Sequence, residues 1–296
     1  MTAPQQKMGF FALVGKPNAG KSSLLNALVG QKVSIVSFKP QTTRNKIMGI
    51  YSGDDHQMVF LDTPGFIRPD NLLSEYMHKE IATATDFVDG IIFVLDSTSS
   101  LDNQLQNSLQ RYAKQNLIVA INKVDIGGFE KVYPLIERIQ SLVPNATILP
   151  LSAKTKQNID VLLQTCKNIS PLGDPHFDKS QVTDKTMRFI AAETIREKIL
   201  LQYEEEIPHG VSVVITLFQE KPTVTVIEAE IICNKESHKP IIIGNNGNGI
   251  KNIGQLARLE LQDIIGTKIY LKLFVKVRKD WKDNQNFVND FGYKIN

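Results

Sequence analysis

The chain has 296 residues, a hydrophobic content of 42% and a formal net charge of +3. This length favours two domains, and the hydrophobic content is sufficient for packed cores and excludes wholesale disorder. The 2 cysteines and 5 histidines are scattered, so the sequence supports neither a disulfide framework nor a zinc site with protein ligands. The apolar runs are much shorter than the ~20 residues of a membrane span, and no signal peptide precedes the first run, so we expect an intracellular protein.

The first half of the chain alternates short apolar runs with longer amphipathic segments. This pattern is typical of β/α units around a mostly parallel sheet. The expected strands span residues 9–14, 45–51, 57–62, 90–96, 117–122 and 147–151. The sequence therefore predicts an α/β domain over residues 1–173.

A polar stretch rich in proline and glycine, residues 174–187, is expected to be a linker. The remaining residues, 188–296, begin with a helical period and continue with two β-rich runs at 211–219 and 223–233. A glycine-rich segment, an amphipathic helix from Ile250 and a strictly alternating strand at 269–277 follow. This order predicts a second, α+β domain.

Residues 15–22 match the P-loop pattern G-x-x-x-x-G-K-[ST] between an expected strand and an expected helix. The backbone N–H groups of such a loop converge on phosphate oxygens at the positive end of the helix. Lys21 is expected to neutralise the β- and γ-phosphates and Ser22 to ligate Mg²⁺. The candidate phosphate-binding residues are Gly15, Lys16, Pro17, Asn18, Ala19, Gly20, Lys21, Ser22 and Ser23.

Three later motifs select the nucleotide. Asp62, Thr63, Pro64 and Gly65 end the third expected strand, where a P-loop fold places the carboxylate that holds Mg²⁺ and an N–H for the γ-phosphate. Each of the three motifs is weak alone, but the order in which all three follow the P-loop predicts a GTP site. The guanine-binding candidates, which follow the last two expected strands of this domain, are Asn122, Lys123, Asp125, Ser152, Ala153 and Lys154. An aspartate there accepts two hydrogen bonds from guanine, whereas adenine offers no such donor pair.

These motifs resemble those of the translation-factor-like GTPases. With Gln41-Thr42-Thr43-Arg44 and the segment Ile242-Ile243-Gly244-Asn245-Asn246-Gly247, they resemble most closely the Era family. The resemblance runs from about Gly9 to Gly292. It implies a P-loop GTPase domain followed by a type II KH domain, a role in assembling the small ribosomal subunit, and binding to the 3′ end of its RNA. It also implies that Thr43 ligates Mg²⁺, although Thr42 remains an alternative.

Two residues bear on hydrolysis. Phe66 stands where Ras-type GTPases carry a water-orienting glutamine, so slow intrinsic turnover is expected, with Lys21, Thr43 and Gly65 as the catalytic candidates. In related GTPases, an asparagine at the position of Asn18 helps to hold a K⁺ ion. The alternative is that Asn18 only caps the loop through bonds to its own backbone.

The second domain has two candidate RNA features. A KH glycine loop clamps about four nucleotides of single-stranded RNA, and here the candidates are Ile243, Gly244, Asn245, Asn246, Gly247 and Lys251. Many relatives carry lysine within and just after this loop, whereas this chain has Asn246 and Gly249. The last strand alternates cations with aromatic residues, which predicts either a solvated face or a surface that follows phosphates or a membrane.

The leading hypothesis is a GTP-hydrolysing switch that couples nucleotide state to RNA binding. The alternatives are a membrane- or protein-docking GTPase whose second domain binds no RNA, and a tRNA-modifying GTPase, although the sequence contains no additional catalytic domain. The expected partners are single-stranded RNA, the small ribosomal subunit and an anionic membrane surface, and no DNA is expected. The expected location is the cytoplasm, or peripherally the inner face of the cell membrane.

Overall fold

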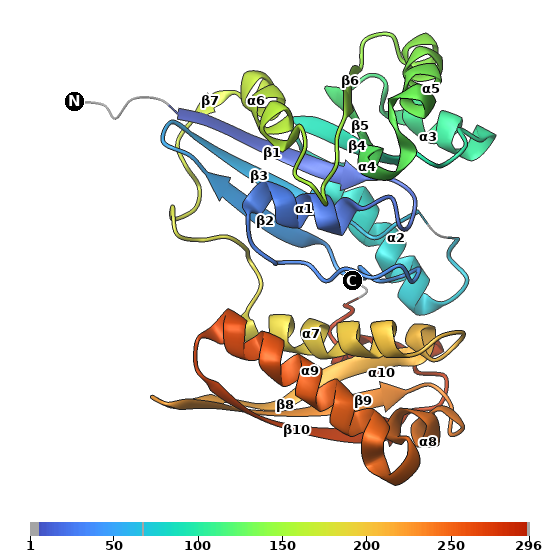
Figure 1. The fold of residues 1–296 in the computed structure, drawn as a ribbon, viewed down its shortest axis with the longest axis vertical. Helices are drawn as coiled ribbons and strands as arrows, with labels where there is room; N and C mark the ends of the chain where they lie inside the picture. The colour runs from blue at the N-terminus through green and yellow to red at the C-terminus, as the bar shows by residue number, and fades with distance from the viewer. Residues whose placement is uncertain (1–5, 67, 295–296) are drawn as a thin grey trace. The chain divides into compact units, whose positions relative to one another are not determined.

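The computed structural model describes residues 6–66 and 68–294, and its chain divides into two compact units (Figure 1). The first unit comprises Met1–Ser34, Thr43–Ile67 and Met77–Asp184. The second comprises Ile35–Thr42, Arg68–Tyr76 and Lys185–Asn296. None of the helices in the described residues is long and apolar enough to cross a membrane.

The sheet of the first unit is mostly parallel. Its strand order is β2-β3-β1-β4-β5-β6, and the short β7 pairs antiparallel with β1. Only β2 among the six strands of the main path runs antiparallel to its neighbour, β3. The strand bounds are β1 Gln6–Val14, β2 Ile47–Ser52, β3 His56–Asp62, β4 Gly90–Asp96, β5 Leu117–Asn122, β6 Thr147–Pro150 and β7 Leu172–Gly173.

The central strands are continuous apolar runs because helices cover both faces of the sheet. In β4 and β5, every residue except Asp96 is buried. Strand and helix side chains together form one core around Phe93 and Val119, with Leu109 and Ile139 contributed by α3 and α5. The helix bounds are α1 Lys21–Val29, α2 Leu72–Thr85, α3 Asn103–Tyr112, α4 Val124–Gly127, α5 Phe129–Leu142 and α6 Ile159–Ile169.

Parallel strands place all the motif loops at one edge of the sheet. The P-loop follows β1, Asp62 ends β3, Asn122 ends β5 and Ser152 follows β6. In a sheet of this kind, the carboxyl ends of the strands are where ligands bind. The four motifs, which span more than a hundred residues of sequence, are therefore brought to the same edge.

Residues 174–184, expected to be part of a linker, are held against this sheet. Gln57 Oε1 accepts hydrogen bonds from the N–H groups of His176 and Phe177, both at 3.0 Å. Ile50 N donates to Val182 O at 2.9 Å. The first unit consequently extends to Asp184 rather than ending at residue 173.

The second unit contains a three-stranded sheet in the order β10-β9-β8. Strand β8 is antiparallel to β9, whereas β10 is parallel to it. The helices α7 and α9 lie on one face of this sheet (Figure 1), where Ile195, Ile199, Ile253 and Ala257 pack against Ile231. The bounds are α7 Met187–Gln202, β8 Val211–Glu220, β9 Val224–Cys233, α8 His238–Ile243, α9 Asn248–Ile265, β10 Lys268–Val277 and α10 Gln285–Asp290.

Candidate nucleotide and RNA sites

The P-loop geometry requires glycine immediately before α1. Gly20 has a φ of 94°, in the left-handed region, and a Cβ at this position would lie 2.3 Å from Asn122 Nδ2. A side chain there would be strained by this backbone conformation and would displace the Asn122 side chain at the end of β5. Helix α1 begins directly after Gly20, and its first turn contains Lys21, Ser22 and Ser23.

Lys21 is buried inside the loop that it would use to bind phosphate. Its Nζ donates to Gly15 O at 3.1 Å and to Lys16 O at 3.0 Å. Burial lowers the pKa of Lys21 to about 8, and the charge of Asp62 partly opposes this shift. Among the described residues, the hydrogen-bond partners of this buried ammonium are loop carbonyls, so it is well suited to an anionic ligand, because a buried charge needs a partner of opposite charge.

Oxygen ligands converge beside Lys21. Asp62 Oδ2 accepts hydrogen bonds from Ser22 Oγ at 2.6 Å and from Ser34 Oγ at 3.0 Å, and Ser22 Oγ lies 2.8 Å from Thr43 Oγ1. Burial raises the pKa of Asp62, and its Oδ1 is buried without a partner among the described residues. Hydroxyl and carboxylate oxygens are the ligands that Mg²⁺ prefers, so these residues fit that ion.

The structure separates Thr42 and Thr43, the two alternative candidates for the Mg²⁺ ligand. Thr43 belongs to the oxygen cluster, whereas the hydroxyl of Thr42 donates to Lys39 O at 2.6 Å. Ser34 was not predicted from the sequence. It reaches Asp62 because Asn26 of α1 accepts hydrogen bonds from Val33 N and Ser34 N, at 2.9 and 3.0 Å. No sequence signal marks this serine, since its position depends on that tertiary contact.

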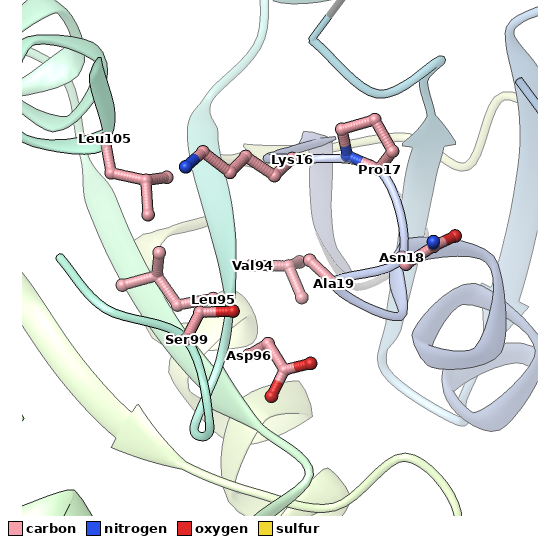
Figure 2. A pocket seen from close by; sticks show the side chains of 9 residues that line it. All are labelled: Lys16, Pro17, Asn18, Ala19, Val94, Leu95, Asp96, Ser99 and Leu105. Carbon is pink, nitrogen blue, oxygen red and sulfur yellow. The ribbon is translucent and has the colours of Figure 1, made fainter. Parts of the chain in front are cut away.

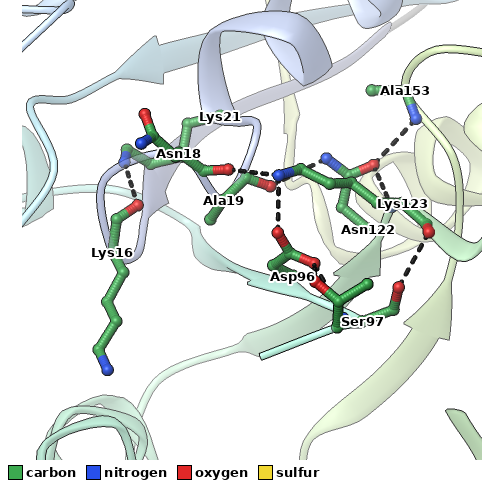
Figure 3. Close-up of polar contacts among 10 residues, drawn as sticks. Lys16, Asn18, Ala19, Lys21, Asp96, Ser97, Asn122, Lys123 and Ala153 are labelled. Atoms are coloured by element: carbon green, nitrogen blue, oxygen red, sulfur yellow. Dashed lines mark hydrogen bonds and ion pairs between the residues drawn. The ribbon is translucent and has the colours of Figure 1, made fainter. Parts of the chain in front are cut away.

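Asn122 joins three loops (Figure 3). Its Nδ2 donates to Ala19 O at 3.0 Å, and its Oδ1 accepts from Lys123 N at 2.8 Å and from Ala153 N at 3.0 Å. This amide therefore connects the P-loop to both expected guanine-binding loops. The N–H of Ala153, a candidate donor to the guanine oxygen, is occupied by Asn122 in this structure.

Lys123 extends along the P-loop, as Figure 3 shows. Its Nζ donates to Asn18 O at 2.7 Å and to Asp96 Oδ2 at 2.6 Å. Asp125 is exposed and accepts a hydrogen bond from Ser152 Oγ at 2.7 Å, so the two expected base-binding loops are linked. Asp96, at the end of β4, was not predicted as part of this site, although its position at a strand end was a usable signal.

A small cavity lies between the P-loop and the end of β4 (Figure 2), with a volume of about 130 Å³. Its lining residues are Lys16, Pro17, Asn18, Ala19, Val94, Leu95, Asp96, Ser99 and Leu105. The side chain of Lys16 extends toward α3 and pairs with Asp102, the N-cap of that helix. Lys16 therefore offers its backbone, and not its ammonium group, to the phosphate-binding loop.

The loop after β3 packs closely on the P-loop. A Cβ at Gly65 would lie 2.6 Å from Pro17 N, and Phe66 N donates to Gly15 O at 3.3 Å. Thr63 Oγ1 donates to Leu13 O at 2.7 Å, which anchors the loop to β1. The Phe66 ring packs against the core, with its centroid 6.0 Å from that of Phe93. The Phe66 side chain therefore contributes to the packing of the core.

The glycine loop of the second unit is built between α8 and α9. Asn246 and Gly247 have φ values of 52° and 78°, and the Cβ direction of Gly247 meets nothing within 4 Å. Two residues at the end of α7 form hydrogen bonds to the two sides of the loop. Tyr203 Oη donates to Ile242 O at 3.0 Å, and Gln202 Nε2 donates to Gly249 O at 3.3 Å. Gly247 therefore faces open space that a ligand backbone can approach.

A groove of about 450 Å³ continues from this loop between α9 and the edge strand β10. It contains Lys251, the one cation predicted for the RNA site, and two polar residues that were not predicted, Gln255 and Arg258. Lys251, Gln255 and Arg258 are spaced by four and then three residues, so they share one face of α9. This spacing is visible in the sequence. The remaining lining residues are Ile250, Gly254, Leu271, Lys272 and Leu273.

Both parts of the chain are similar to known proteins. The family described as 50S ribosome-binding GTPase matches residues 10–123, and the KH domain family matches residues 206–282. GTPase Era of Ruminiclostridium cellulolyticum is 40% identical over 293 residues, covering 98% of each chain. GTPase Era of Clostridium beijerinckii is 41% identical over 294 residues, again covering 98% of each chain.

Two solved structures are similar over the same length. One is a variant of Aquifex aeolicus Era bound to GDP and AlF4⁻. The other is Era in complex with MgGDPNP and nucleotides 1506–1542 of 16S ribosomal RNA. Each has a TM-score of 0.94 and 39% sequence identity, and covers 98% of this chain and 100% of its own.

The mostly parallel sheet, the P-loop and the match to a GTPase family define a P-loop GTPase, and the second unit is a KH domain. At about 40% identity over nearly its whole length, the chain belongs to the GTPase Era family.

Proposed function

We propose that this chain is a GTP-hydrolysing switch that binds Mg²⁺ together with GTP or GDP. In this proposal it also binds the 3′ end of small-subunit ribosomal RNA and assists assembly of that subunit. The observation that carries the nucleotide part is the cluster of Ser22, Thr43 and Asp62, in which a buried carboxylate oxygen has no partner among the described residues. The similarity to an Era structure holding MgGDPNP and 16S ribosomal RNA supports both parts.

Each residue of the cluster has a role in this proposal. Lys21 turns from the carbonyls of Gly15 and Lys16 to the β- and γ-phosphates. Ser22, Thr43 and Asp62 hold Mg²⁺, which when bound neutralises charge on the phosphates. Gly65 N–H donates to the γ-phosphate, where charge develops as the bond to the leaving group breaks.

The attacking water is held by backbone groups or by a partner. Phe66, the residue after Gly65, has neither a donor nor an acceptor in its side chain, and its ring packs against Phe93. Positioning a nucleophile is a large part of catalysis in phosphoryl transfer. We therefore propose slow intrinsic turnover that a bound partner accelerates.

The RNA part rests on the loop and the groove of the second unit. Gly247 lets the RNA backbone approach, and Gly244 lets the loop pass close to the backbone of Gly249. Lys251 and Arg258 provide positive charge along the groove. The free edge of β10 adds backbone donors and acceptors that bases can pair with. We place the protein in the cytoplasm, and peripheral contact with the inner face of the membrane stays a prediction.

Nucleotide specificity tests the GTPase assignment through Asp125. Calorimetry with GDP, GTP and ATP on the parent chain is expected to show ATP binding weaker by about 10⁴-fold, because adenine lacks the donor pair that the carboxylate needs. Asp125→Asn is expected to weaken GDP binding and to favour xanthosine diphosphate, whose ring complements an amide. Comparable affinities of the parent for ATP and GTP would contradict the assignment.

A further inference from the structure

The face of the second unit's sheet opposite α7 and α9 is covered at one end, where Ser212 and Ile232 are buried and Ser212 Oγ lies 3.4 Å from Tyr293 Oη. The rest of this face, which includes the outward side of β10, is exposed and is called the open face. The residues Ile269, Leu271, Leu273, Val275 and Val277 of β10 point toward α7 and α9 and pack in the core. The intervening residues of the strand therefore point to the opposite face. On that face, Tyr270 is 58% exposed and Phe274 is 40% exposed. Two half-exposed rings on one strand are unusual for a solvated surface, since aromatic side chains are normally buried.

Positive charge alternates with these rings along the same strand. The outward-facing row of β10 and the residue after it is Lys268, Tyr270, Lys272, Phe274, Lys276 and Arg278. Lys272 Nζ lies 4.9 Å from the centroid of the Phe274 ring, so cation and ring already interact. The rings of Tyr270 and Phe274 are four residues apart, or about 13 Å along a strand. A row of cations with interleaved rings is the arrangement by which proteins bind single-stranded nucleic acid, with bases stacked on the rings.

The open face is continuous with the groove already described. Lys272 lines that groove and also belongs to the outward-facing row, because β10 is the edge strand of its sheet. A strand of RNA that leaves the groove at Lys272 can therefore cross the edge of the sheet and continue over Tyr270 and Phe274. The groove alone accommodates about the four nucleotides that a glycine loop clamps.

The neighbouring strand decides between RNA and a membrane. Glu228 and Glu230 of β9 share the open face, and pair with Lys272 at 3.9 Å and with Lys276 at 2.5 Å. A flat anionic membrane on this face would meet these two carboxylates together with the lysines. An RNA strand following β10 meets the carboxylates of β9 only along one side, and its phosphates compete with them for Lys272 and Lys276. The ion pairs are half-exposed and cost little to open.

We propose that the outward-facing row of β10, from Lys268 to Arg278, is a second RNA-binding surface that extends the groove of the KH domain. Its ligand is single-stranded RNA that continues beyond the nucleotides clamped by the glycine loop. Tyr270 and Phe274 stack bases, and Lys268, Lys272, Lys276 and Arg278 contact phosphates. This inference rests on the proposed RNA-binding function.

The test compares two RNAs on three proteins by fluorescence anisotropy. The RNAs are taken from the 3′ end of small-subunit ribosomal RNA, one of about four nucleotides, which fills the groove, and one of about twelve. The proteins are the full parent chain, the double variant Tyr270→Ala with Phe274→Ala, and Leu217→Ala. Leu217 is 38% exposed on the same face but lies on β8, away from the row, so its variant is the matched control.

The double variant is expected to bind the long RNA at least about tenfold more weakly than the parent, since the two stacked bases together contribute that much or more. Its affinity for the short RNA and its unfolding temperature are expected to be unchanged, and Leu217→Ala is expected to behave like the parent. Equal affinity of the parent and the double variant for the long RNA would overturn the inference. If, in addition, only the parent bound vesicles containing phosphatidylglycerol, the face would be a membrane surface. A parent that binds neither RNA would instead contradict the proposed function itself.

Discussion

At the residue scale, the nucleotide site contains charged groups whose partners within the chain are incomplete. Lys21 is held only by loop carbonyls and by the charge of Asp62, and one oxygen of Asp62 has no partner among the described residues. Burying charge in this way costs stability unless a ligand completes the set of contacts. Phosphate and a cation would complete the contacts of Lys21 and Asp62.

Asn18 carries a prediction about monovalent cations. Its backbone has a φ of 63°, and its carbonyl accepts a hydrogen bond from Lys123 Nζ. If its side chain helps to hold K⁺ beside the phosphates, GTP hydrolysis is expected to be faster in KCl than in NaCl at equal ionic strength. Asn18→Asp keeps a residue that tolerates this backbone conformation and changes only the side-chain group. Phosphate release at equal rates in the two salts would leave Asn18 with a loop-capping role.

Phe66 carries a prediction that separates chemistry from stability. Because its ring packs against Phe93 and offers nothing to a water molecule, Phe66→Ala is expected to lower the free energy of unfolding by about 2 kcal/mol while leaving hydrolysis within a few-fold of the parent. Lys21→Ala is the contrasting variant and is expected to abolish turnover. Denaturant unfolding and phosphate release, measured on the same samples, check both parts. Loss of hydrolysis in a folded, GTP-binding Phe66→Ala protein would show that the ring has a role in the site.

At the element scale, the fully buried strands were the most predictable from sequence. The bounds of β4 and β5 agree with the predicted ranges because each is a continuous apolar run that ends in a polar residue. The helix α8 was not predicted, since it is short, contains Pro240 and ends in an apolar triplet that resembles a strand. The contacts of residues 176–182 depend on the buried Gln57 side chain and on β2, and no local pattern encodes them.

The candidate sites likewise contain residues that the sequence predicts and residues whose roles depend on tertiary contacts. The four nucleotide motifs could be placed from sequence because each directly follows a strand of a parallel sheet. The role of Ser34 could not, because it depends on Asn26 holding the loop after α1 so that Ser34 reaches Asp62 of β3. Likewise, the glycine loop was visible in the sequence. The contribution of Lys272 to the groove depends on β10 being an edge strand, and only the topology gives that.

The glycine loop gives an element-scale prediction about charge. Asn246→Lys adds one cation next to the groove, so it is expected to tighten RNA binding and to steepen the salt dependence of the affinity by up to about 0.7 in a log–log plot. The φ of 52° at this position favours asparagine, and a lysine there is expected to cost stability of about 1 kcal/mol. Asn246→Gln is the matched control, because it meets a similar backbone strain without the charge. An unchanged salt slope in Asn246→Lys would place the RNA backbone away from this residue.

At the scale of the whole molecule, the two functions occupy different units. The nucleotide motifs from Gly15 to Lys154 lie in the first unit, whereas the glycine loop, the groove and β10 lie in the second. The segment Ile35–Thr42, which precedes Thr43, belongs to the second unit. In that unit Val36 N donates to Glu197 Oε1 at 2.9 Å, and Arg196 of α7 donates to Thr42 O. The chain therefore joins α7 directly to the residue next to a proposed Mg²⁺ ligand.

This division predicts that RNA binding can be removed without removing hydrolysis, and Gly247 is the position for the test. A Cβ at Gly244 would lie 2.7 Å from the backbone of Gly249 and would distort the loop itself, whereas Gly247 faces open space. Gly247→Asp adds bulk and a negative charge where the RNA backbone approaches. Gly247→Asn adds the same bulk without the charge, and both residues tolerate a positive φ.

The most direct test of the account is a titration of RNA from the 3′ end of small-subunit ribosomal RNA, followed by anisotropy, against the parent, Gly247→Asn and Gly247→Asp. GTP hydrolysis is measured on the same three preparations. The parent is expected to bind the RNA, Gly247→Asp to lose most of the affinity and Gly247→Asn part of it, and all three proteins to hydrolyse GTP at similar basal rates. If Gly247→Asp binds that RNA as tightly as the parent, the glycine loop is an ordinary turn and the account of RNA recognition is contradicted.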